Sequence, residues 1–154
     1  MIAGRRVLAV VPARGGSKGL PRKNVQPFLG VPLVAVVATV IAGVPACDRA
    51  VVSTDDEEIA AVAEAAGLPA PFRRPPDLSG DRIGDLEVLQ HALATMEALD
   101  ATTYDIVLML QPTSPLRTVA DVQATLDALV AGDWDAAWTV SEADRKYHPY
   151  KQLT

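Results

Sequence analysis

The sequence predicts an α/β fold of three layers, with helices on both faces of a mostly parallel sheet. Short apolar runs that indicate buried strands occur at residues 7–11, 49–53 and 105–110, and stretches with helical periodicity separate them. Strands that alternate with helices in this way form parallel sheets covered on both faces. The length of 154 residues corresponds to one domain, so we expect residues 1–154 to form a single unit.

The first helix is predicted inside the uncharged stretch Phe28–Cys47, which follows the first strand. Twenty uncharged residues are long enough to span a membrane. However, Pro32 and Gly43 limit the helix to about ten residues, or roughly half of the hydrocarbon thickness of a bilayer. We therefore expect a buried helix that begins at Pro32 and ends near Gly43, and no contact with a membrane.

The second strand, residues 49–53, leads directly into the acidic segment 54–58. We expect Ser53 or Thr54 to cap a helix here, because carboxylates in the first turn favour the positive end of the helix dipole. A metal site at Asp55 and Asp56 is the alternative interpretation.

The second half of the chain continues the alternation. Residues 70–73 are a candidate third strand, and Leu86, Leu89, Leu93 and Met96 keep helical spacing within a helix expected at 84–99. Residues 105–110 form the clearest buried strand. Thr118 is expected to cap a helix that ends at Gly132, and Ala136–Val140 is expected to be a final strand.

Charge is distributed unevenly along the chain. Six of the 14 basic residues and none of the 19 acidic residues lie at positions 1–47, which leaves eight basic and 19 acidic residues in the remainder. Such a chain should repel nucleic acid, so we expect a small anionic partner. The single cysteine, Cys47, excludes an internal disulfide and favours a cytoplasmic location, and an early proline and arginine interrupt any signal-like run.

Four of the basic residues lie in the Gly-rich loop 12–24, which follows the first strand. In open α/β sheets, ligands bind at this carboxyl edge. Glycines let backbone amides face an anion, and several cations together match a chain of phosphates. The spacing fits neither the Walker pattern nor Gly-x-Gly-x-x-Gly, so we expect a nucleoside triphosphate bound in another way. The residues concerned are Gly15, Gly16, Gly19, Arg14, Lys18 and Lys23.

Three blocks of sequence carry a resemblance to a known family. They are PARGGSKGLPRKN at 12–24, RPPDLSGD at 74–81 and LQPTSPLRT at 110–118. Together they resemble the acylneuraminate cytidylyltransferases, the CMP-sialic acid synthetase family. The resemblance implies a Rossmann-like fold of the nucleotide-diphospho-sugar transferase type. It also implies transfer of CMP from CTP to a sialic-type sugar acid with release of pyrophosphate, Mg²⁺ as cofactor, and a homodimer.

Roles for individual residues follow from their charge and from the resemblance. Arg14 and Lys23 are expected to be catalytic, because phosphoryl transfer needs positioning and neutralisation of phosphate charge. Lys18 and the amides of Gly15 and Gly16 would hold the outer phosphates. The resemblance adds three further residues: Asn24 toward the ribose or base, Arg74 on the nucleotide, and Gln111 against the acceptor sugar.

Structural alternatives stay open for these residues. Asn24 either contacts the nucleotide or is only a turn residue. Arg74 contacts either the nucleotide or an acidic neighbour, Asp77 or Asp81. Gln111 contacts either the sugar or its own loop backbone, and Arg117 in the same loop either has a role in binding or only caps or braces the loop.

The chain departs from the family in two places. Asp81–Asp85 replaces a Thr/Ser-rich stretch that helps to hold the nucleotide, which leaves open the choice of base, the affinity, or whether this segment faces the ligand. The family's metal-binding acidic pair is expected beyond residue 154. Residues 141–154 are expected to be the start of a truncated dimerisation segment, because 147–151 resemble the family's entry into that segment. Two other functions stay open: a non-catalytic or regulatory nucleotide-binding relative, and a cytidylyltransferase for a different acceptor.

Overall fold

The computed structural model describes residues 1–140, which are built around a parallel three-stranded sheet. Its central strand is β1 (Val7–Pro12), flanked by β4 (Arg49–Ser53) on one side and β5 (Ile106–Met109) on the other. Residues 7–11 are fully buried. A strand covered on both faces requires apolar side chains at every position, which explains why this run does not alternate with polar residues.

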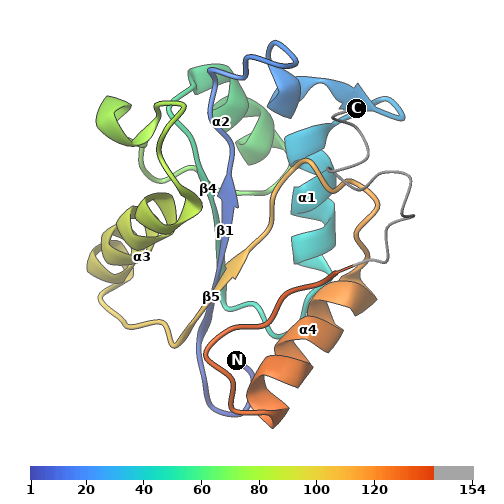
Figure 1. Ribbon diagram of the computed structural model, residues 1–154, viewed down its shortest axis with the longest axis vertical. Helices are drawn as coiled ribbons and strands as arrows, with labels where there is room; N and C mark the ends of the chain where they lie inside the picture. Colours follow the sequence, from blue (N-terminus) through green and yellow to red (C-terminus); the bar gives the residue numbers. More distant parts are fainter. Residues whose placement is uncertain (141–154) are drawn as a thin grey trace, which may run out of the picture.

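Helices cover both faces of this sheet (Figure 1). The helices α1 (Leu33–Ala42), α2 (Glu57–Ala65) and α4 (Val119–Ala131) share one core with the side chains on one face of β1. The helix α3 (Asp85–Asp100) packs against the other face. The predicted three-layer α/β/α architecture with a parallel sheet is therefore confirmed.

Two helices begin and end where the sequence predicts. Pro32 precedes α1 and Gly43 follows its last residue. Thr118 caps α4: its hydroxyl accepts from the Asp121 amide at 3.2 Å, while the Asp121 carboxylate accepts from the Thr118 amide at 2.9 Å. This reciprocal pair satisfies two amides at the start of the helix, and Gly132 follows its end.

The predicted cap of α2 is wrong. Asp56 is the capping residue, and its Oδ1 atom accepts from the amides of Glu58 and Ile59 at 2.9 and 3.0 Å. Thr54 lies two residues too early, and its hydroxyl accepts from the Asp56 amide, at 3.1 Å, and not from an amide of the helix. A carboxylate in this position also meets the positive end of the helix dipole, which a hydroxyl does less well.

Both additional strands that the sequence suggested are absent from residues 1–140. Residues 70–73 form no strand, because Pro69 and Pro71 have no amide proton to donate to a ladder. Only the flanking residues bond to β4 or to the residue after it: the Pro69 carbonyl accepts from Val52, and the Arg74 amide donates to Thr54. Residues 136–140 form no strand either. Trp138 and Val140 in this segment are almost fully exposed, so no neighbouring strand buries their alternate side chains.

The buried face of α3 agrees with the prediction at Met96, and in part at Leu89 and Leu93, which pack partly buried against the core. Val88, Ala92 and Met96 are buried, while Leu86 is exposed. Short elements complete the described chain. They are the turns of 3₁₀ helix η1 (Lys23–Val25) and η2 (Pro76–Leu78), and the antiparallel hairpin of β2 (Pro27–Phe28) and β3 (Val31–Pro32).

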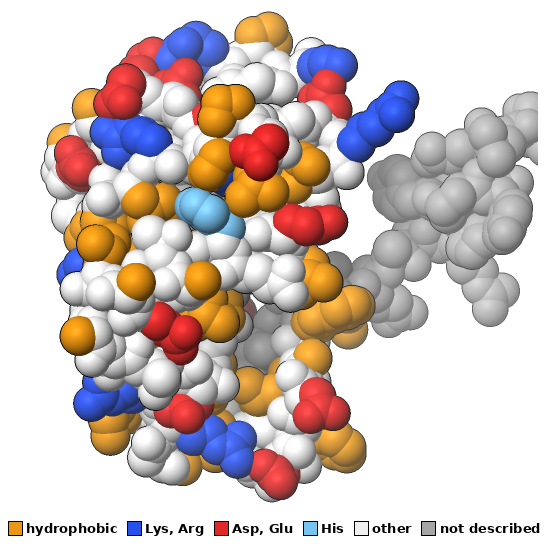
Figure 2. Space-filling view, turned by 90° about the vertical axis from the view of Figure 1, so that its left-hand side faces the viewer, with side chains coloured by type: hydrophobic (Ala, Val, Ile, Leu, Met, Phe, Trp, Pro, Cys, Tyr) orange, Lys and Arg blue, Asp and Glu red, His pale blue; other side chains and the backbone are white. Residues whose placement is uncertain are grey.

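The surface on the side of α3 mixes basic and acidic side chains at both ends of the molecule (Figure 2). None of the helices in residues 1–140 is both long enough and apolar enough to span a membrane. The part of the chain with the predicted dimerisation segment, 141–154, lies outside the described residues.

Candidate functional site

The order of the strands defines where a ligand should bind. The chain passes from β1 to β4 on one side and later places β5 on the other side of β1. Ligands in open α/β sheets bind outside the carboxyl ends of the strands at such a reversal. A cavity of about 770 Å³ lies at this point, lined by Pro12 at the end of β1, by Arg14 after it, and by Gln111–Thr113 after β5.

This cavity collects most of the residues that the sequence predicted to bind a ligand. Its lining includes Arg14, Lys18, Lys23, Asn24, Arg74 and Gln111. Two carboxylates, Asp81 and Asp85, also line it, so four cationic side chains face two acidic ones. We therefore call it the cationic cavity.

The four cations of the loop do not all face the cavity. Lys23 lines it and has no salt-bridge partner within residues 1–140. Arg22 instead turns toward α2, where it pairs with Glu58 and lies 3.7 Å from Asp56. Lys23 is thus available to an incoming anion, whereas Arg22 fixes the loop to the start of α2.

Gly15 and Gly16 lie in the loop but do not line the cavity. The Gly15 amide donates to Oδ1 of Asp55 at 3.0 Å. Contrary to our expectation, this amide is therefore not free to bind a phosphate. A Cβ atom on Gly15 would come within 2.7 Å of Asp56 Oδ2, whereas one on Gly16 would meet nothing within 4 Å. Gly15 therefore allows the loop to approach the carboxylates at the end of β4.

Asn24 closes the loop from its other end. Its side chain is buried, and its Nδ2 atom donates to the Arg14 carbonyl at 2.9 Å. Asn24 consequently has a structural role in holding the loop together, in addition to its place in the cavity wall.

Arg74 is the most unusual residue of the cavity, because it is a buried cation with unused donors. It is 5% exposed, its backbone amide donates to the Thr54 carbonyl at 2.8 Å, and its Nε and Nη2 atoms have no hydrogen-bond partner. Its ion pair is with Asp55, 3.8 Å away, and not with Asp77 or Asp81. Burial lowers the pKa of Arg74, and the Asp55 charge opposes this effect. Buried donors without partners are rare, and Arg74 is among the residues that line the cavity, so it is a candidate for contact with a ligand.

Asp81 lies across the cavity from the loop and binds two of its cations. Its Oδ1 atom is 2.8 Å from Nη1 of Arg14, and its Oδ2 atom pairs with Lys18. These contacts with Lys18 and Arg14 lower the pKa of Asp81. The segment that departs from the family pattern therefore faces the cavity, which answers one question that the sequence left open.

Gln111 lines the cationic cavity from the loop after β5, and Arg117 lies behind it in the same loop. The Gln111 Nε2 atom donates to Oδ2 of Asp85 at 3.1 Å. The side-chain oxygen of Gln111 takes no part in this bond. Arg117 donates to the Gln111 carbonyl at 3.4 Å and so braces the loop. Sequence reasoning gave no role to Asp85, although it lies at the start of a predicted helix near one of the three blocks.

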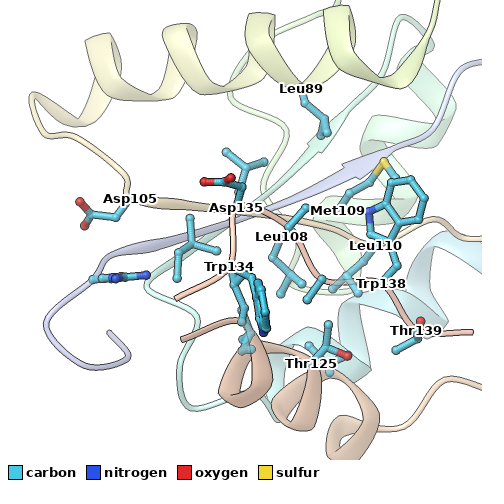
Figure 3. A pocket seen from close by; sticks show the side chains of 18 of the residues that line it. Leu89, Asp105, Leu108, Met109, Leu110, Thr125, Trp134, Asp135, Trp138 and Thr139 are labelled. Carbon is cyan, nitrogen blue, oxygen red and sulfur yellow. The ribbon is translucent and has the colours of Figure 1, made fainter. Parts of the chain in front are cut away.

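A second cavity, of about 880 Å³, lies along β5 and extends to residues 133–139. Figure 3 shows Leu89 entering it from α3 and Thr125 from α4, with Leu108 and Met109 of β5 between them. It shares Asp85 and Gln111 with the cationic cavity, but none of the four cations named above lines it. We call it the β5 cavity.

No group of three or more potential metal ligands occurs among residues 1–140. The two carboxylates in the cationic cavity are engaged, Asp81 with two cations and Asp85 with Gln111. The expected metal ligands beyond residue 154 lie outside the described residues.

The fold and the position of the cationic cavity define a three-layer α/β protein with a candidate ligand site at the carboxyl ends of its parallel strands. A solved CMP:2-keto-3-deoxy-manno-octonic acid synthetase complexed with CTP superimposes with a TM-score of 0.66 at 24% identity, over 83% of this chain and 48% of that one. A cytidylyltransferase from Leptospira borgpetersenii gives a TM-score of 0.62 at 22% identity, over 82% of this chain and 50% of that one. These similarities establish the fold, the predicted nucleotide-diphospho-sugar transferase type.

The sequence model described as Cytidylyltransferase matches residues 8–151, so the chain belongs to the cytidylyltransferase family. A CMP-N,N'-diacetyllegionaminic acid synthase from Legionella pneumophila is 41% identical over 73% of this chain and 48% of its own length. A pseudaminic acid cytidylyltransferase from Campylobacter jejuni is 41% identical over 71% and 47%. An N-acylneuraminate cytidylyltransferase from Escherichia coli is 36% identical over 73% and 25%. The chain spans about half the length of the first two curated relatives.

Proposed function

We propose that the protein transfers CMP from CTP to a nonulosonic sugar acid and releases pyrophosphate. The observation that supports this most directly is Arg74, a buried guanidinium in the wall of a cation-lined cavity, with two nitrogen atoms that have no hydrogen-bond partner. The relatives named above as synthases and cytidylyltransferases act on acids of this class according to their names. Which of these acids is the acceptor stays a question for experiment.

In this proposal the triphosphate lies against the loop after β1. Arg14 and Lys23 neutralise the α-phosphate and the departing pyrophosphate, and Lys18 holds the outer phosphates. Arg74 and Asn24 contact the ribose or base. Because Arg74 is buried, a hydrogen bond from it to the nucleotide would be made in a poorly hydrated setting, where such bonds are stronger than in water.

The acceptor sugar would lie beside Gln111, at the junction of the two cavities. Its anomeric hydroxyl oxygen attacks the α-phosphorus, the bond to the bridging oxygen of pyrophosphate breaks, and the hydroxyl proton passes to a base or to solvent. The protein contributes mainly by holding the reactants in line and by stabilising negative charge. Gln111, oriented by its bond to Asp85, would present its side-chain oxygen to a sugar hydroxyl.

Three further features are proposed on the basis of the family. Magnesium would accompany the nucleotide, and since the described residues do not provide a ready set of ligands for it, phosphate oxygens would supply part of its coordination. The protein would form a homodimer. It would act in the cytoplasm, which its single cysteine suits.

Release of pyrophosphate from CTP tests the proposal. The full chain would be incubated with CTP and, separately, with N-acetylneuraminic, legionaminic and pseudaminic acid, and pyrophosphate would be measured. We expect release with at least one of them and loss of turnover in Lys23→Ala. The matched control is Arg82→Ala, which removes a cation that does not itself line the cavity, although its neighbours Asp81 and Ile83 do.

Three results would contradict parts of this proposal. Full activity of Lys23→Ala would remove Lys23 from the phosphate site. Saturable CTP binding without turnover on any acceptor would favour a non-catalytic nucleotide-binding protein, and turnover only with a different keto-sugar acid would favour another acceptor.

A further inference from the structure

One carboxylate occupies the part of the cationic cavity where the proposed function places the outer phosphates. The two oxygens of Asp81 bind two different cations, Arg14 at 2.8 Å and Lys18. Both cations line the cavity, and so does Asp81. A carboxylate that bridges two cations makes the same kind of contacts as a phosphate group, which also offers several acceptor oxygens to Arg and Lys.

We propose that Asp81 is a resident counter-ion of the phosphate site, which holds Arg14 and Lys18 in the nucleotide-free protein and is displaced when a polyphosphate binds. This inference rests on the proposed function, because it takes the outer phosphates to be the groups that displace Asp81. It assigns Asp81 a role in setting the affinity for the nucleotide and in the release of pyrophosphate.

The geometry allows such an exchange. The Asp81 side chain is 39% exposed and that of Arg14 is 33% exposed, so Asp81 has access to solvent on leaving the two cations. Asp81 belongs to the segment between η2 and α3, whereas both cations belong to the loop after β1. The ion pairs therefore join two separate segments across the cavity, and breaking them leaves the hydrogen bond that closes the loop, from Asn24 to Arg14, in place.

Charge decides the direction of the exchange. A carboxylate carries one negative charge, while pyrophosphate and triphosphate carry several, so a polyphosphate competes successfully for the same cations. An anion with a single charge gains no comparable advantage. Asp81 would therefore favour polyphosphates over singly charged anions, and would return to Arg14 and Lys18 as pyrophosphate leaves.

Titration with a base-free ligand tests this role. Inorganic tripolyphosphate would be titrated calorimetrically into the full chain in EDTA, with the Asp81→Asn variant in parallel. Removing the competing charge should tighten binding roughly three- to tenfold, as expected for the loss of two exposed ion pairs. In the catalytic assay the same variant should show a lower KM for CTP and stronger inhibition by pyrophosphate, a pattern that a loss of folding would not produce.

The matched control is Asp77→Asn, which removes the same charge from η2, just before the segment of Asp81, at an exposed position that does not line the cavity. It should bind within about twofold of the wild type. Asp81→Ser provides a second variant if Asp81→Asn folds poorly, as judged by thermal unfolding.

The outcomes separate the two proposals. Equal or weaker binding by both Asp81 variants, with measurable binding by the wild type, overturns the counter-ion role and leaves the proposed function intact. Tighter binding by both variants supports it. Absence of tripolyphosphate and CTP binding in the wild type and all variants overturns the proposed function together with this inference.

Discussion

The two cavities share Asp85 and Gln111 but are built on different principles. The β5 cavity is the larger, and its aliphatic wall also carries four aspartates, two arginines and two exposed tryptophans. In the smaller cationic cavity the balance is reversed, with four cations and two carboxylates. Contacts of the side chains hold part of this lining in place: Asn24 bonds to the Arg14 carbonyl, and Asp81 pairs with two cations. The comparison teaches that the sign of the lining charge, and not volume, distinguishes a candidate site for phosphate groups.

Removal of the buried cation should produce the largest effect. Arg74→Ala should weaken CTP binding by about 2–5 kcal/mol, or thirtyfold and more, because it removes a buried charge and leaves Asp55 without its partner. Calorimetric titration with CTP would measure this. Arg117→Ala is the control, since Arg117 lines only the β5 cavity and should change the Kd less than threefold. Similar losses in both variants would abolish the distinction between the cavities.

A methyl group at Gly15 tests how tightly the loop beside the cationic cavity is fitted. In Gly15→Ala the added Cβ would meet the Asp56 carboxylate, so we expect a destabilisation of about 1–3 kcal/mol and a loosened loop. Gly16→Ala has open space around it and should stay within about 0.5 kcal/mol of the wild type. Urea unfolding of the two variants would compare them. Equal stabilities would show that the loop adapts without strain.

A substitution at Gln111, which lines both cavities, should distinguish binding of the acceptor from binding of the nucleotide. Gln111→Ala removes the amide that bonds to Asp85, and should raise the KM for the sugar acid about tenfold, which corresponds to about 1.4 kcal/mol. The KM for CTP should change less than threefold. Steady-state kinetics with each substrate varied in turn would measure both, with Gln123→Ala on α4 as control. A rise confined to the KM for CTP would assign Gln111 to the nucleotide.

The smallest effect is expected in the β5 cavity. Trp138→Ala should leave the Kd for CTP within twofold and the stability within about 0.5 kcal/mol, because this side chain is 87% exposed. The only two tryptophans of the chain line this cavity, so CTP should also leave the tryptophan emission of the wild type nearly unchanged. A large spectral change, or a tenfold loss of affinity in the variant, would move the nucleotide toward this cavity.

Local signals explain what could be predicted from the sequence. The buried strands were recognisable because every position of 7–11 is apolar, and the ends of α1 and α4 because Pro32, Gly43, Thr118 and Gly132 act through their own backbone and immediate neighbours. The strand expected at 136–140 failed for the opposite reason. A strand depends on its neighbour, and no strand within residues 1–140 pairs with this segment.

The candidate site shows the same division. The cations of the loop could be predicted because they stand together in the sequence after a strand. The contact of Asp81 with Arg14 joins residues 67 positions apart, and that of Gly15 with Asp55 joins residues 40 positions apart. Such pairs depend on tertiary packing, which the periodicity of neighbouring residues does not contain.

The hydrogen bond from Asn24 to the Arg14 carbonyl has a consequence for the thermodynamics of binding. Fixing a flexible backbone residue costs about 1–2 kcal/mol in conformational entropy, and the bond spans ten positions. Because the loop is closed in the ligand-free protein, this entropy is lost during folding and not when a ligand arrives. A weaker bond at Asn24 would therefore shift an ordering cost from folding to binding, and would appear as a more unfavourable binding entropy even where every contact with the ligand is unchanged.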